Sequence, residues 1–427
     1  SHINLMEDYC IGLIGFGTVG AGVYDILYKR AEELKKRYQV NLRITRVCVR
    51  DLAKKRSVPI QDYTTVTDNY MDILTDDSIR LVIELIGGIE PAFTIMKECF
   101  VRGKAFVTGN KALLASHMKE VESLMEAHPQ VGFGFEATVG GGTPIIHTLQ
   151  TYYNTDDIYE LCGIINGSTN FILSKMLLDK KDYDSVYNEA RSLGYLEANS
   201  AFDIEGYDCR SKLVILNRLA FGVRCDEEAI ACEGISAIRK EDVAYWREKG
   251  FHLKLVATSQ FDQERQTLFS CVLPCAVAAS NPLASVHYAN NMVQLCSLDC
   301  RTVSIIGSGA GRYPTANSVI TDVLSILARP CAARAVFPLA RDTRVSSDLS
   351  GKFVIRFGQE VSLVVVDELA EELARSFDDY ELNEAPTRDG LMLTVNGSFE
   401  VVRRIRDMCV SKYCLKRSSV LLLRVMN

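Results

Sequence analysis

The sequence lacks several features that mark specialised classes of protein. No apolar run reaches the length needed to cross a membrane, and the N-terminal residues SHINLMEDYC lack the basic start and apolar core of a signal peptide. The net charge is −6, whereas nucleic-acid-binding domains are usually basic. We therefore expect a soluble, cytoplasmic protein with no nucleic-acid partner and no membrane partner.

Paired cysteines and clustered histidines are also missing. The 14 cysteines contain no C-x-x-C pair and lie mostly within apolar segments, so we expect reduced, buried thiols rather than disulfides. None of the six histidines has a metal-ligand spacing to another histidine or to a cysteine. This spacing argues against a transition-metal site.

Chain length and apolar patterning bound the architecture. The 427 residues are too many for one hydrophobic core, so two or three domains are expected. In the first third, apolar runs alternate with helical patterns, which predicts an α/β domain with a doubly wound parallel sheet of the Rossmann type. The expected strands cover residues 9–14, 42–49, 80–86, 105–109 and 131–137, and the expected helices 18–37, 91–102 and 112–127.

The rest of the chain shows two further patterns. Expected helices at 168–179, 183–195 and 207–221 and strands at 158–165, 252–261, 268–278 and 302–309 predict an α+β domain with one sheet face covered. From residue 352 the order strand, helix, strand, strand, helix, strand predicts a small ferredoxin-like domain. The expected domains are 1–145, to which 307–335 returns, then 146–306 and 350–427.

A glycine pattern follows the first strand, in the segment GLIGFGTVG. Gly15 permits a tight turn, Gly17 lets the backbone approach a pyrophosphate, and Gly20 lets helix and strand pack closely. The helix N-terminus then offers N–H groups to the phosphates. The alternative is a turn without a ligand, but the strand–helix context favours a dinucleotide site that includes Phe16, Thr18 and Val19.

The end of the second strand bears on the choice between NAD and NADP. An acidic residue there favours NAD through the ribose hydroxyl, whereas an arginine accommodates the 2′-phosphate of NADP. Either Arg50 or Asp51 could occupy the position that contacts the ribose. Because Arg50 falls at the strand end, we favour NADP. A solvated basic loop is the alternative interpretation, so both cofactors stay open.

Two lysines and two carboxylates suit the reduction of a carbonyl group. Asp208 and Lys212 share one helix face, and Glu197 lies a short loop upstream. Carboxylates can hold a substrate ammonium, and a lysine can give a proton to the alkoxide as hydride arrives. Lys111 follows the fourth strand, where ligands of such sheets bind. By itself, an Asp–Lys pair at this spacing is more often a surface ion pair.

The segment FEATVGGGTPII combines Glu136 with three consecutive glycines. A carboxylate and a curved row of backbone carbonyls could hold a hard monovalent cation through oxygen alone. A hinge between domains is the alternative reading, and the two are compatible.

Seven ordered segments together resemble homoserine dehydrogenase. They are GLIGFGTVG, ELIGGIEPA (84–92), VTGNKALLA (107–115), FEATVGGGTPII (135–146), INGSTNFIL (165–173), GYLEANSAFDIEGYDCRSKLVIL (194–216) and GSGAGRYPTANSVITDV (307–323). The resemblance implies an NAD(P)-dependent oxidoreductase that interconverts L-aspartate 4-semialdehyde and L-homoserine. This reaction serves the biosynthesis of threonine, methionine and isoleucine.

The resemblance also implies roles for individual residues. Lys212 would transfer the proton with help from Lys111, and Glu197 and Asp208 would bind the substrate amino group. Asn166, Gly167 and Thr169 would line the substrate pocket. Gly87, Gly88, Lys111, Gly309 and Gly311 would join the cofactor site. Glu136 and the carbonyls of Val139, Gly141 and Thr143 would hold sodium or potassium.

The chain departs from the family pattern in places. Asn199 and Ser200 replace a common Asp-Pro pair, and Arg312 and Tyr313 replace smaller or apolar residues. The tail resembles an ACT domain in its order of elements, but its first turn lacks the Pro-Gly of effector sites, so it would serve subunit contact in a homodimer or homotetramer. Inhibition by threonine is a further hypothesis.

Two other functions remain as alternatives at this point. One is a dehydrogenase of another small semialdehyde, which in its phosphate-dependent form needs a nucleophilic cysteine. Only Cys162 and Cys209 fall in or near the segments above. The other is an NAD(P)-binding sensor, although a sensor has no need of a proton donor.

Overall fold

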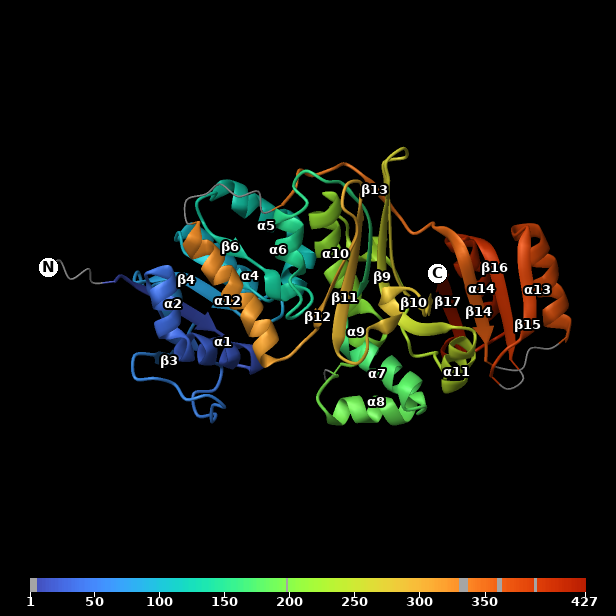
Figure 1. Ribbon diagram of the computed structural model, residues 1–427, viewed down its shortest axis with the longest axis horizontal. Helices are drawn as coiled ribbons and strands as arrows, with labels where there is room; N and C mark the ends of the chain where they lie inside the picture. The colour runs from blue at the N-terminus through green and yellow to red at the C-terminus, as the bar shows by residue number, and fades with distance from the viewer. Residues whose placement is uncertain (1–5, 197–198, 330–336, 359–362, 388–389) are drawn as a thin grey trace. The chain divides into compact units, whose positions relative to one another are not determined.

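The structure is a computed structural model that describes residues 6–196, 199–329, 337–358, 363–387 and 390–427. The chain forms two compact units (Figure 1). The first contains residues up to Asn154 together with Gly307–Leu339, and the second contains Thr155–Ile306 and Ala340–Asn427.

The first unit is built on a six-stranded parallel sheet in the order β3-β2-β1-β4-β5-β6. This order reverses direction between β1 and β4, as in dinucleotide-binding folds, so the predicted Rossmann-type sheet is confirmed. The strands are β1 (Asp8–Ile14), β2 (Asn41–Cys48), β3 (Thr65–Thr67), β4 (Ile79–Glu84), β5 (Ala105–Thr108) and β6 (Phe133–Gly134). The helices are α1 (Thr18–Lys29), α2 (Ala31–Tyr38), α3 (Met71–Leu74), α4 (Ala92–Val101), α5 (Lys111–Ala127), α6 (Ile145–Thr151) and α12 (Arg312–Ala328).

Two sequence expectations in this unit are wrong. The single helix expected over 18–37 is broken at Arg30, where the backbone leaves helical geometry (φ −101°, ψ 8°), because α2 exposes a mostly charged surface and has no buried residue to hold it in line with α1. The strand expected over 131–137 pairs only at Phe133 and Gly134, and a 3₁₀ turn (Glu136–Thr138) follows. Burial alone cannot distinguish such a turn from a strand.

The second unit contains a mixed sheet whose main path runs β12-β11-β7-β9-β10-β17-β14-β16-β15. Its first part has β7 (Ile158–Ile164), β9 (Phe251–Asp262), β10 (Thr267–Ala278), β11 (Asn290–Ser297) and β12 (Arg301–Ser308), and the short β8 (Ala231–Cys232) and β13 (Arg344–Ser346) pair with β10. β11 was not expected, because NNMVQLCS has only a weak apolar pattern. The helices here are α7 (Gly167–Leu178), α8 (Tyr183–Ser192), α9 (Ala201–Ile204), α10 (Tyr207–Phe221) and α11 (Lys240–Glu248).

The C-terminal part of this unit is ferredoxin-like, as predicted. It comprises β14 (Ser350–Phe357), α13 (Leu363–Ser376), β15 (Asp379–Glu384), β16 (Leu391–Ser398), α14 (Phe399–Lys412) and β17 (Val420–Met426). Its strands lie antiparallel in the order β17-β14-β16-β15. β17 also pairs in parallel with β10, through Cys275–Val277 and Arg424–Met426, so the two sheets are continuous.

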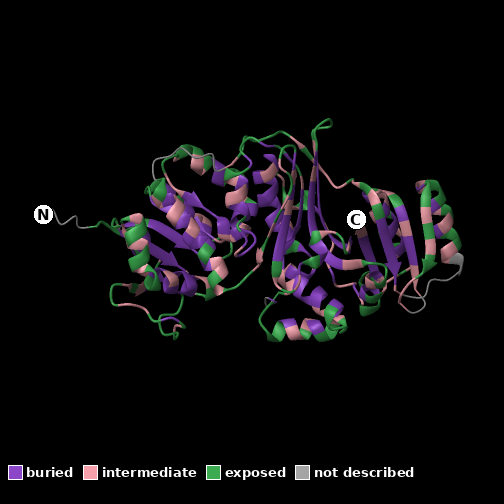
Figure 2. Ribbon diagram, viewed as in Figure 1, coloured by how far each residue is buried: buried purple, intermediate pink, exposed green. Residues whose placement is uncertain are grey.

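Burial follows these layers (Figure 2). Strands are mostly buried, whereas most helices present one exposed side. No helix in the described ranges is long and apolar enough to span a membrane. The described cysteines are free thiols, but only seven of the thirteen are buried, so the expectation that they would be buried holds for about half of them.

Candidate active site

The glycine-rich loop between β1 and α1 has the geometry that its sequence predicts. Gly15 has a positive φ of 104°, a conformation that side chains disfavour. A Cβ at Gly20 would lie 2.2 Å from the Gly15 carbonyl oxygen, so only glycine lets α1 begin this close to the strand. A Cβ at Gly17 would meet nothing within 4 Å. The loop therefore leaves open space in front of the N-terminus of α1, where no side chain caps the helix.

A buried carboxylate, Glu84, organises the neighbouring loop after β4. It accepts hydrogen bonds from the Ile86 amide (3.0 Å), the Thr108 hydroxyl (3.1 Å) and the Asn110 side chain (3.1 Å), while burial raises its pKa. Asn110 also donates to the Gly88 carbonyl and caps α5 by accepting from the Leu113 amide. These bonds join the loop of Gly87 and Gly88, both with positive φ, to the start of α5.

Lys111 is the first residue of α5, directly after the Asn110 cap. A cation at a helix N-terminus opposes the helix dipole, so the dipole disfavours a lysine at this position. Lys111 thus begins its helix at the carboxyl end of β5, the edge of the sheet where such folds bind ligands.

Arg50 lies exposed just beyond β2, and Asp51 follows it. The Asp51 carboxylate accepts the Ala53 amide (2.9 Å) and so stabilises its own turn. Arg312, at the start of α12, donates to the Ser57 hydroxyl (3.2 Å) in the same basic loop. Arg50 and Arg312 therefore flank one loop of the first unit, where an adenosine 2′-phosphate would need cations.

Glu136 is buried and accepts the amides of Ile146 (2.8 Å) and His147 (3.3 Å) at the start of α6. Burial raises its pKa to about 7, and the nearby Asp322 adds to this shift. Asp322 in turn accepts the Glu136 amide (2.9 Å) and contacts the His147 ring (2.6 Å). Two carboxylates thus share one buried region.

The loop after Glu136 packs tightly on the 307–311 turn. The Gly142 amide donates to the Ser308 carbonyl (2.9 Å), and a Cβ at Gly141 would lie 2.4 Å from the Gly309 carbonyl oxygen. The Gly141 carbonyl accepts the Ser318 hydroxyl (2.6 Å), and the Thr143 carbonyl accepts the Ile145 amide (2.8 Å). Val139 is buried beside them, and Gly311, with φ 126°, precedes α12.

A second set of residues converges in the second unit. Asn166 caps α7 by accepting the Thr169 amide (2.8 Å), and its side-chain nitrogen donates to Asp203 (2.8 Å) and Asp208 (2.8 Å). The Lys212 ammonium lies 2.8 Å from the same Asp208 oxygen and donates to the Ile165 carbonyl (2.7 Å).

This pair differs from an ordinary surface ion pair. The side chains of Lys212 and Asp208 are 11% and 3% exposed. A buried ion pair with further hydrogen bonds to each partner is costly to assemble, which sets this pair apart from a solvated surface pair.

The remaining predicted residues are placed as follows. Gly167 begins α7, where a Cβ would lie 3.1 Å from the Ala289 carbonyl oxygen. Glu197 lies outside the described residues. Lys111 and the cofactor-loop glycines belong to the first unit, whereas Asn166, Asp208 and Lys212 belong to the second.

Two residues of the site were not predicted from the sequence. Asp203 shares the Asn166 amide with Asp208, and its signal was the acidic spacing in FDIEGYD. Glu84 looked like the end of an apolar strand. The signal in the sequence was a single carboxylate followed by two glycines. This pattern suits a buried acid that holds a loop in place through hydrogen bonds.

The cysteine-based alternative finds no support in the thiols themselves. Burial raises the pKa of Cys162 to about 12, and the pKa of the fully buried Cys209 is also raised. Since the thiolate is the nucleophile, neither group is activated for covalent attack.

Comparisons with known proteins identify the family to which the chain belongs. Residues 15–136 match the family model "Homoserine dehydrogenase, NAD binding domain", and residues 144–324 match the model "Homoserine dehydrogenase". The chain is 36% identical to the homoserine dehydrogenase of Bacillus subtilis over 75% of its own length and 73% of that protein. It is 38% identical to the enzyme of Synechocystis sp. over 74% and 73% of the two chains.

Solved structures give the same result. A homoserine dehydrogenase from Thiobacillus denitrificans superposes with a TM-score of 0.84 at 30% identity, covering 98% of each chain. A hyperthermophilic archaeal homoserine dehydrogenase in complex with NADPH superposes with a TM-score of 0.63 at 25% identity, covering 78% of this chain and 100% of that one. The chain belongs to the homoserine dehydrogenase family of NAD(P)-dependent oxidoreductases.

Proposed function

We propose that the cluster of Asn166, Asp203, Asp208 and Lys212, together with Glu197, binds the amino-acid substrate and moves its proton. The observation that carries this assignment is the buried Lys212 ammonium, held 2.8 Å from Asp208 and 2.7 Å from the Ile165 carbonyl. These two contacts hold the ammonium in one place while leaving one of its three N–H donors for a substrate oxygen.

The chemistry then divides between cofactor and protein. The nicotinamide, when bound, supplies the hydride to the aldehyde carbon or takes it from the alcohol. In the direction of reduction, Lys212 donates a proton to the aldehyde oxygen as negative charge develops there, and in oxidation it accepts the hydroxyl proton. Glu197 and Asp208 hold the substrate ammonium, with Asp203 as a further carboxylate and Gly167 and Thr169 lining the pocket.

We assign the dinucleotide to the crevice of the first unit, with Lys111 assisting proton transfer from its edge. The open space at Gly17 and the uncapped start of α1 fit a pyrophosphate. The residues assigned to the cofactor are Gly15, Phe16, Gly17, Thr18, Val19, Gly20, Arg50, Gly87, Gly88, Lys111, Gly309 and Gly311.

NADP is the cofactor that we propose the chain prefers. Arg50 is exposed at the end of β2, and Arg312 adds a second cation to the same loop. An archaeal relative of similar fold binds NADPH. Replacing Arg50 with glutamate should raise KM for NADP at least about tenfold and leave KM for NAD within about twofold. Equal effects on both cofactors would exclude this role for Arg50.

A monovalent cation, sodium or potassium, fits the loop that follows Glu136. The donors there are oxygens alone, namely Glu136 and the carbonyls of Val139, Gly141 and Thr143. Oxygen ligands suit hard cations, and a cation there would favour the ionised form of the buried Glu136 carboxyl, whose pKa burial raises. The cation would join this loop to the 307–311 turn.

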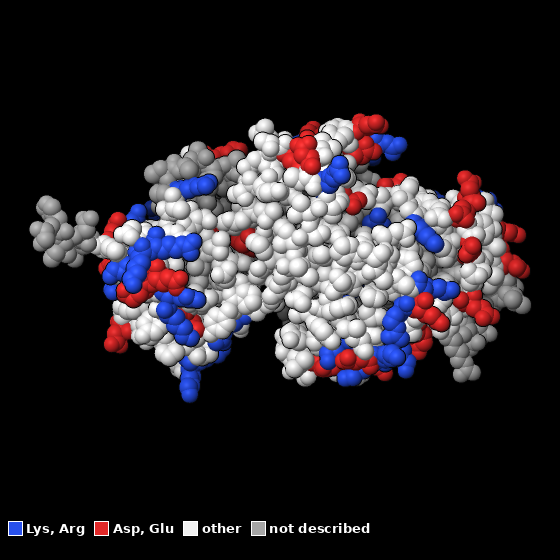
Figure 3. Space-filling model, viewed as in Figure 1, with Lys and Arg blue, Asp and Glu red and all other residues white. Residues whose placement is uncertain are grey.

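We further propose that a second copy of the chain covers the edge of the mixed sheet, giving a homodimer or homotetramer. β12 is an edge strand; Ile306 within it is 56% exposed, and Leu298 in the turn before it is 63% exposed. Charged side chains are sparse over β11 and β12 (Figure 3). An edge with exposed apolar side chains is typical of a surface that pairs with another chain.

Domain roles and location complete the proposal. Residues 1–145 with 307–335 would bind the cofactor, 146–306 the substrate and the partner subunit, and 350–427 would be an ACT-like domain for subunit contact or regulation. The turn at 359–362, where an effector site would be expected, lies outside the described residues. A cytoplasmic location suits the absence of disulfides in the described part of the chain.

The direct experiment follows absorbance at 340 nm with L-homoserine and with NAD or NADP, in sodium, potassium or neither. Lys212→Ala should lose at least about a hundredfold in kcat while its affinity for NADPH stays within twofold of the wild-type value. Lys175→Ala is the matched control, because Lys175 forms a more exposed i,i+4 pair with Asp179 in the same unit. Full turnover in Lys212→Ala would refute the assignment.

A further inference from the structure

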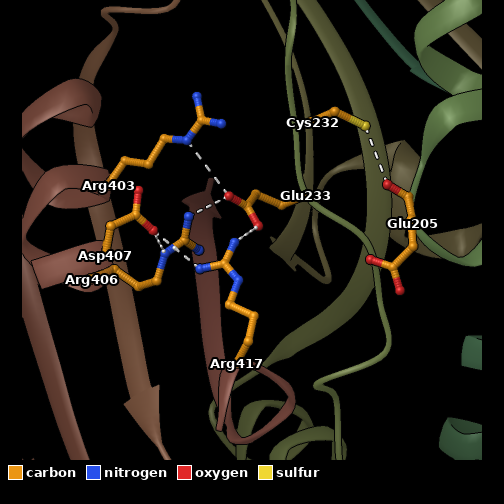
Figure 4. A network of polar contacts seen from close by, with 7 residues as sticks. All are labelled: Glu205, Cys232, Glu233, Arg403, Arg406, Asp407 and Arg417. Carbon is orange, nitrogen blue, oxygen red and sulfur yellow. Dashed lines mark hydrogen bonds and ion pairs between the residues drawn. The ribbon is translucent and has the colours of Figure 1, made fainter. Parts of the chain in front are cut away.

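An ion cluster joins the C-terminal ferredoxin-like part to the segment that follows β8 (Figure 4). The Glu233 carboxylate lies 2.6 Å from the Arg406 guanidinium, 2.8 Å from Arg417 and 3.7 Å from Arg403. Asp407 also contacts Arg406 (2.7 Å) and Arg417 (3.3 Å). The four residues of the cluster other than Glu233 come from α14 and from the turn before β17.

The cluster is buried where it meets Glu233. The Arg406 side chain is 2% exposed and that of Glu233 is 13% exposed. Two arginines that each donate to a different oxygen of a mostly buried carboxylate fix its position more strictly than a surface pair would. A second buried pair, Arg356 with Asp242 (2.6 Å), joins the same two parts of the chain.

The segment that carries Glu233 supports the residues just before α10. The Ile235 amide donates to the Ile204 carbonyl (2.9 Å), and the Cys232 thiol donates to the Glu205 carbonyl (3.3 Å). A Cβ at Gly234 would lie 2.2 Å from the Ile204 carbonyl oxygen. The two backbones are therefore in direct contact on either side of Glu233.

This contact lies only a few residues from Asp203 and Asp208, the carboxylates that we propose bind the substrate. Gly206, the residue before α10, has φ 84°, and a Cβ there would lie 3.0 Å from the Cys232 sulfur. Its amide donates to the Asp203 carbonyl (3.1 Å), and Asp208 lies in the first turn of the helix that it opens. Asp203 and Asp208, which both accept hydrogen bonds from the Asn166 side chain, therefore belong to backbone that packs against residues 232–235.

We propose that Glu233 is a positioning residue through which the C-terminal domain holds Asp203 and Asp208 in place for the substrate ammonium. This inference rests on the proposed substrate role of those carboxylates. Loosening the cluster lets residues 203–206 shift, which weakens substrate binding, while the cofactor loop in the other unit is unaffected.

The test compares Glu233→Gln and Arg417→Gln with Glu368→Gln in the full-length protein. Glu368 is the matched control, since it forms an exposed pair with Lys412 in the same domain. We expect the first two variants to raise KM for L-homoserine about five- to tenfold, with KM for NADP within twofold. Glu233→Asp, which keeps the charge, should recover part of the loss.

The opposite result is equally clear. If KM for homoserine moves no more in Glu233→Gln and Arg417→Gln than in Glu368→Gln, while the melting temperature falls, the cluster only holds the domains together and the proposal is overturned. If Glu233→Gln does not fold, Arg417→Gln decides, because the Arg417 side chain is 49% exposed and its loss is tolerable. An unchanged KM in Asp208→Asn would instead overturn the substrate assignment itself.

Discussion

Asp208→Asn isolates the charge of one carboxylate from its geometry. The Asn166 amide and the Lys212 ammonium both contact the same oxygen, Oδ2, each at 2.8 Å. An amide oxygen at that position can accept both hydrogen bonds, so the variant keeps these two contacts and removes the negative charge. The Asp208 side chain is 3% exposed, so little solvent screens this change.

The magnitude follows from the contacts that the charge supports. A charge-assisted hydrogen bond contributes about 1.5–3 kcal/mol, and each 1.4 kcal/mol is a factor of ten. Loss of the bond to the substrate ammonium should therefore raise KM for L-homoserine by about ten- to a hundredfold. Removing one charge of a buried pair should also lower the free energy of unfolding by up to about 3 kcal/mol.

The assay is a set of initial rates at 340 nm with homoserine varied at saturating NADP, alongside thermal unfolding. Asp179→Asn is the control, because Asp179 forms the corresponding i,i+4 pair with Lys175 at the surface. The control should change neither quantity measurably. A KM for homoserine within twofold of wild type in Asp208→Asn would refute the reasoning.

Three further predictions follow from the same structure. Gly17→Ala should leave the melting temperature unchanged, because a Cβ there meets nothing within 4 Å, yet weaken NADPH binding about tenfold in a fluorescence titration; unchanged affinity would mean that the pyrophosphate lies elsewhere. Burial raises the pKa of Glu136 from 4.5 to about 7. The protonated carboxyl therefore contributes its whole share to the free energy of unfolding below pH 4.5, and this share, about 3 kcal/mol, is lost as the pH rises to about 7. Potassium or sodium should therefore raise the melting temperature more at pH 8 than at pH 5.5, and Glu136→Gln should abolish that difference; equal shifts at both pH values would argue against a cation beside Glu136. Ile306→Glu should reduce the assembled mass measured by light scattering, whereas an unchanged mass would move the subunit interface away from β12.

Much of the fold was predictable because its signals are local. The strand–glycine–helix pattern at Gly15–Gly20 and the alternation of elements predicted the parallel sheet. The break at Arg30 and the short β6 were not predicted, since both depend on what the segment packs against. The pairing of β10 with β17 is a contact between residues about 150 positions apart, and no local pattern encodes it.

The residues of the candidate site also divide into those that a local sequence pattern indicates and those that depend on tertiary contacts. The spacing of Asp208 and Lys212 predicted that they share one helix face, and the structure brings them within 2.8 Å. Their assignment to a site came from the family resemblance, because the spacing alone is more typical of a surface ion pair. Asp203 was missed because its partnership passes through Asn166, which lies far away in the sequence. Glu84 was missed because a buried acid at a strand end differs from an exposed one only in its tertiary surroundings.

The central claim is that the Lys212 amine itself carries the proton of the reaction. Its most direct test is chemical rescue: Lys212→Ala assayed with L-homoserine and NADP in rising concentrations of small primary amines, with Lys175→Ala as the control. The account predicts a slow variant whose rate increases with amine concentration and depends on amine basicity, and a control that does not respond. A Lys212→Ala variant with wild-type kcat would contradict this claim, and so would a variant whose residual rate does not change with any added amine.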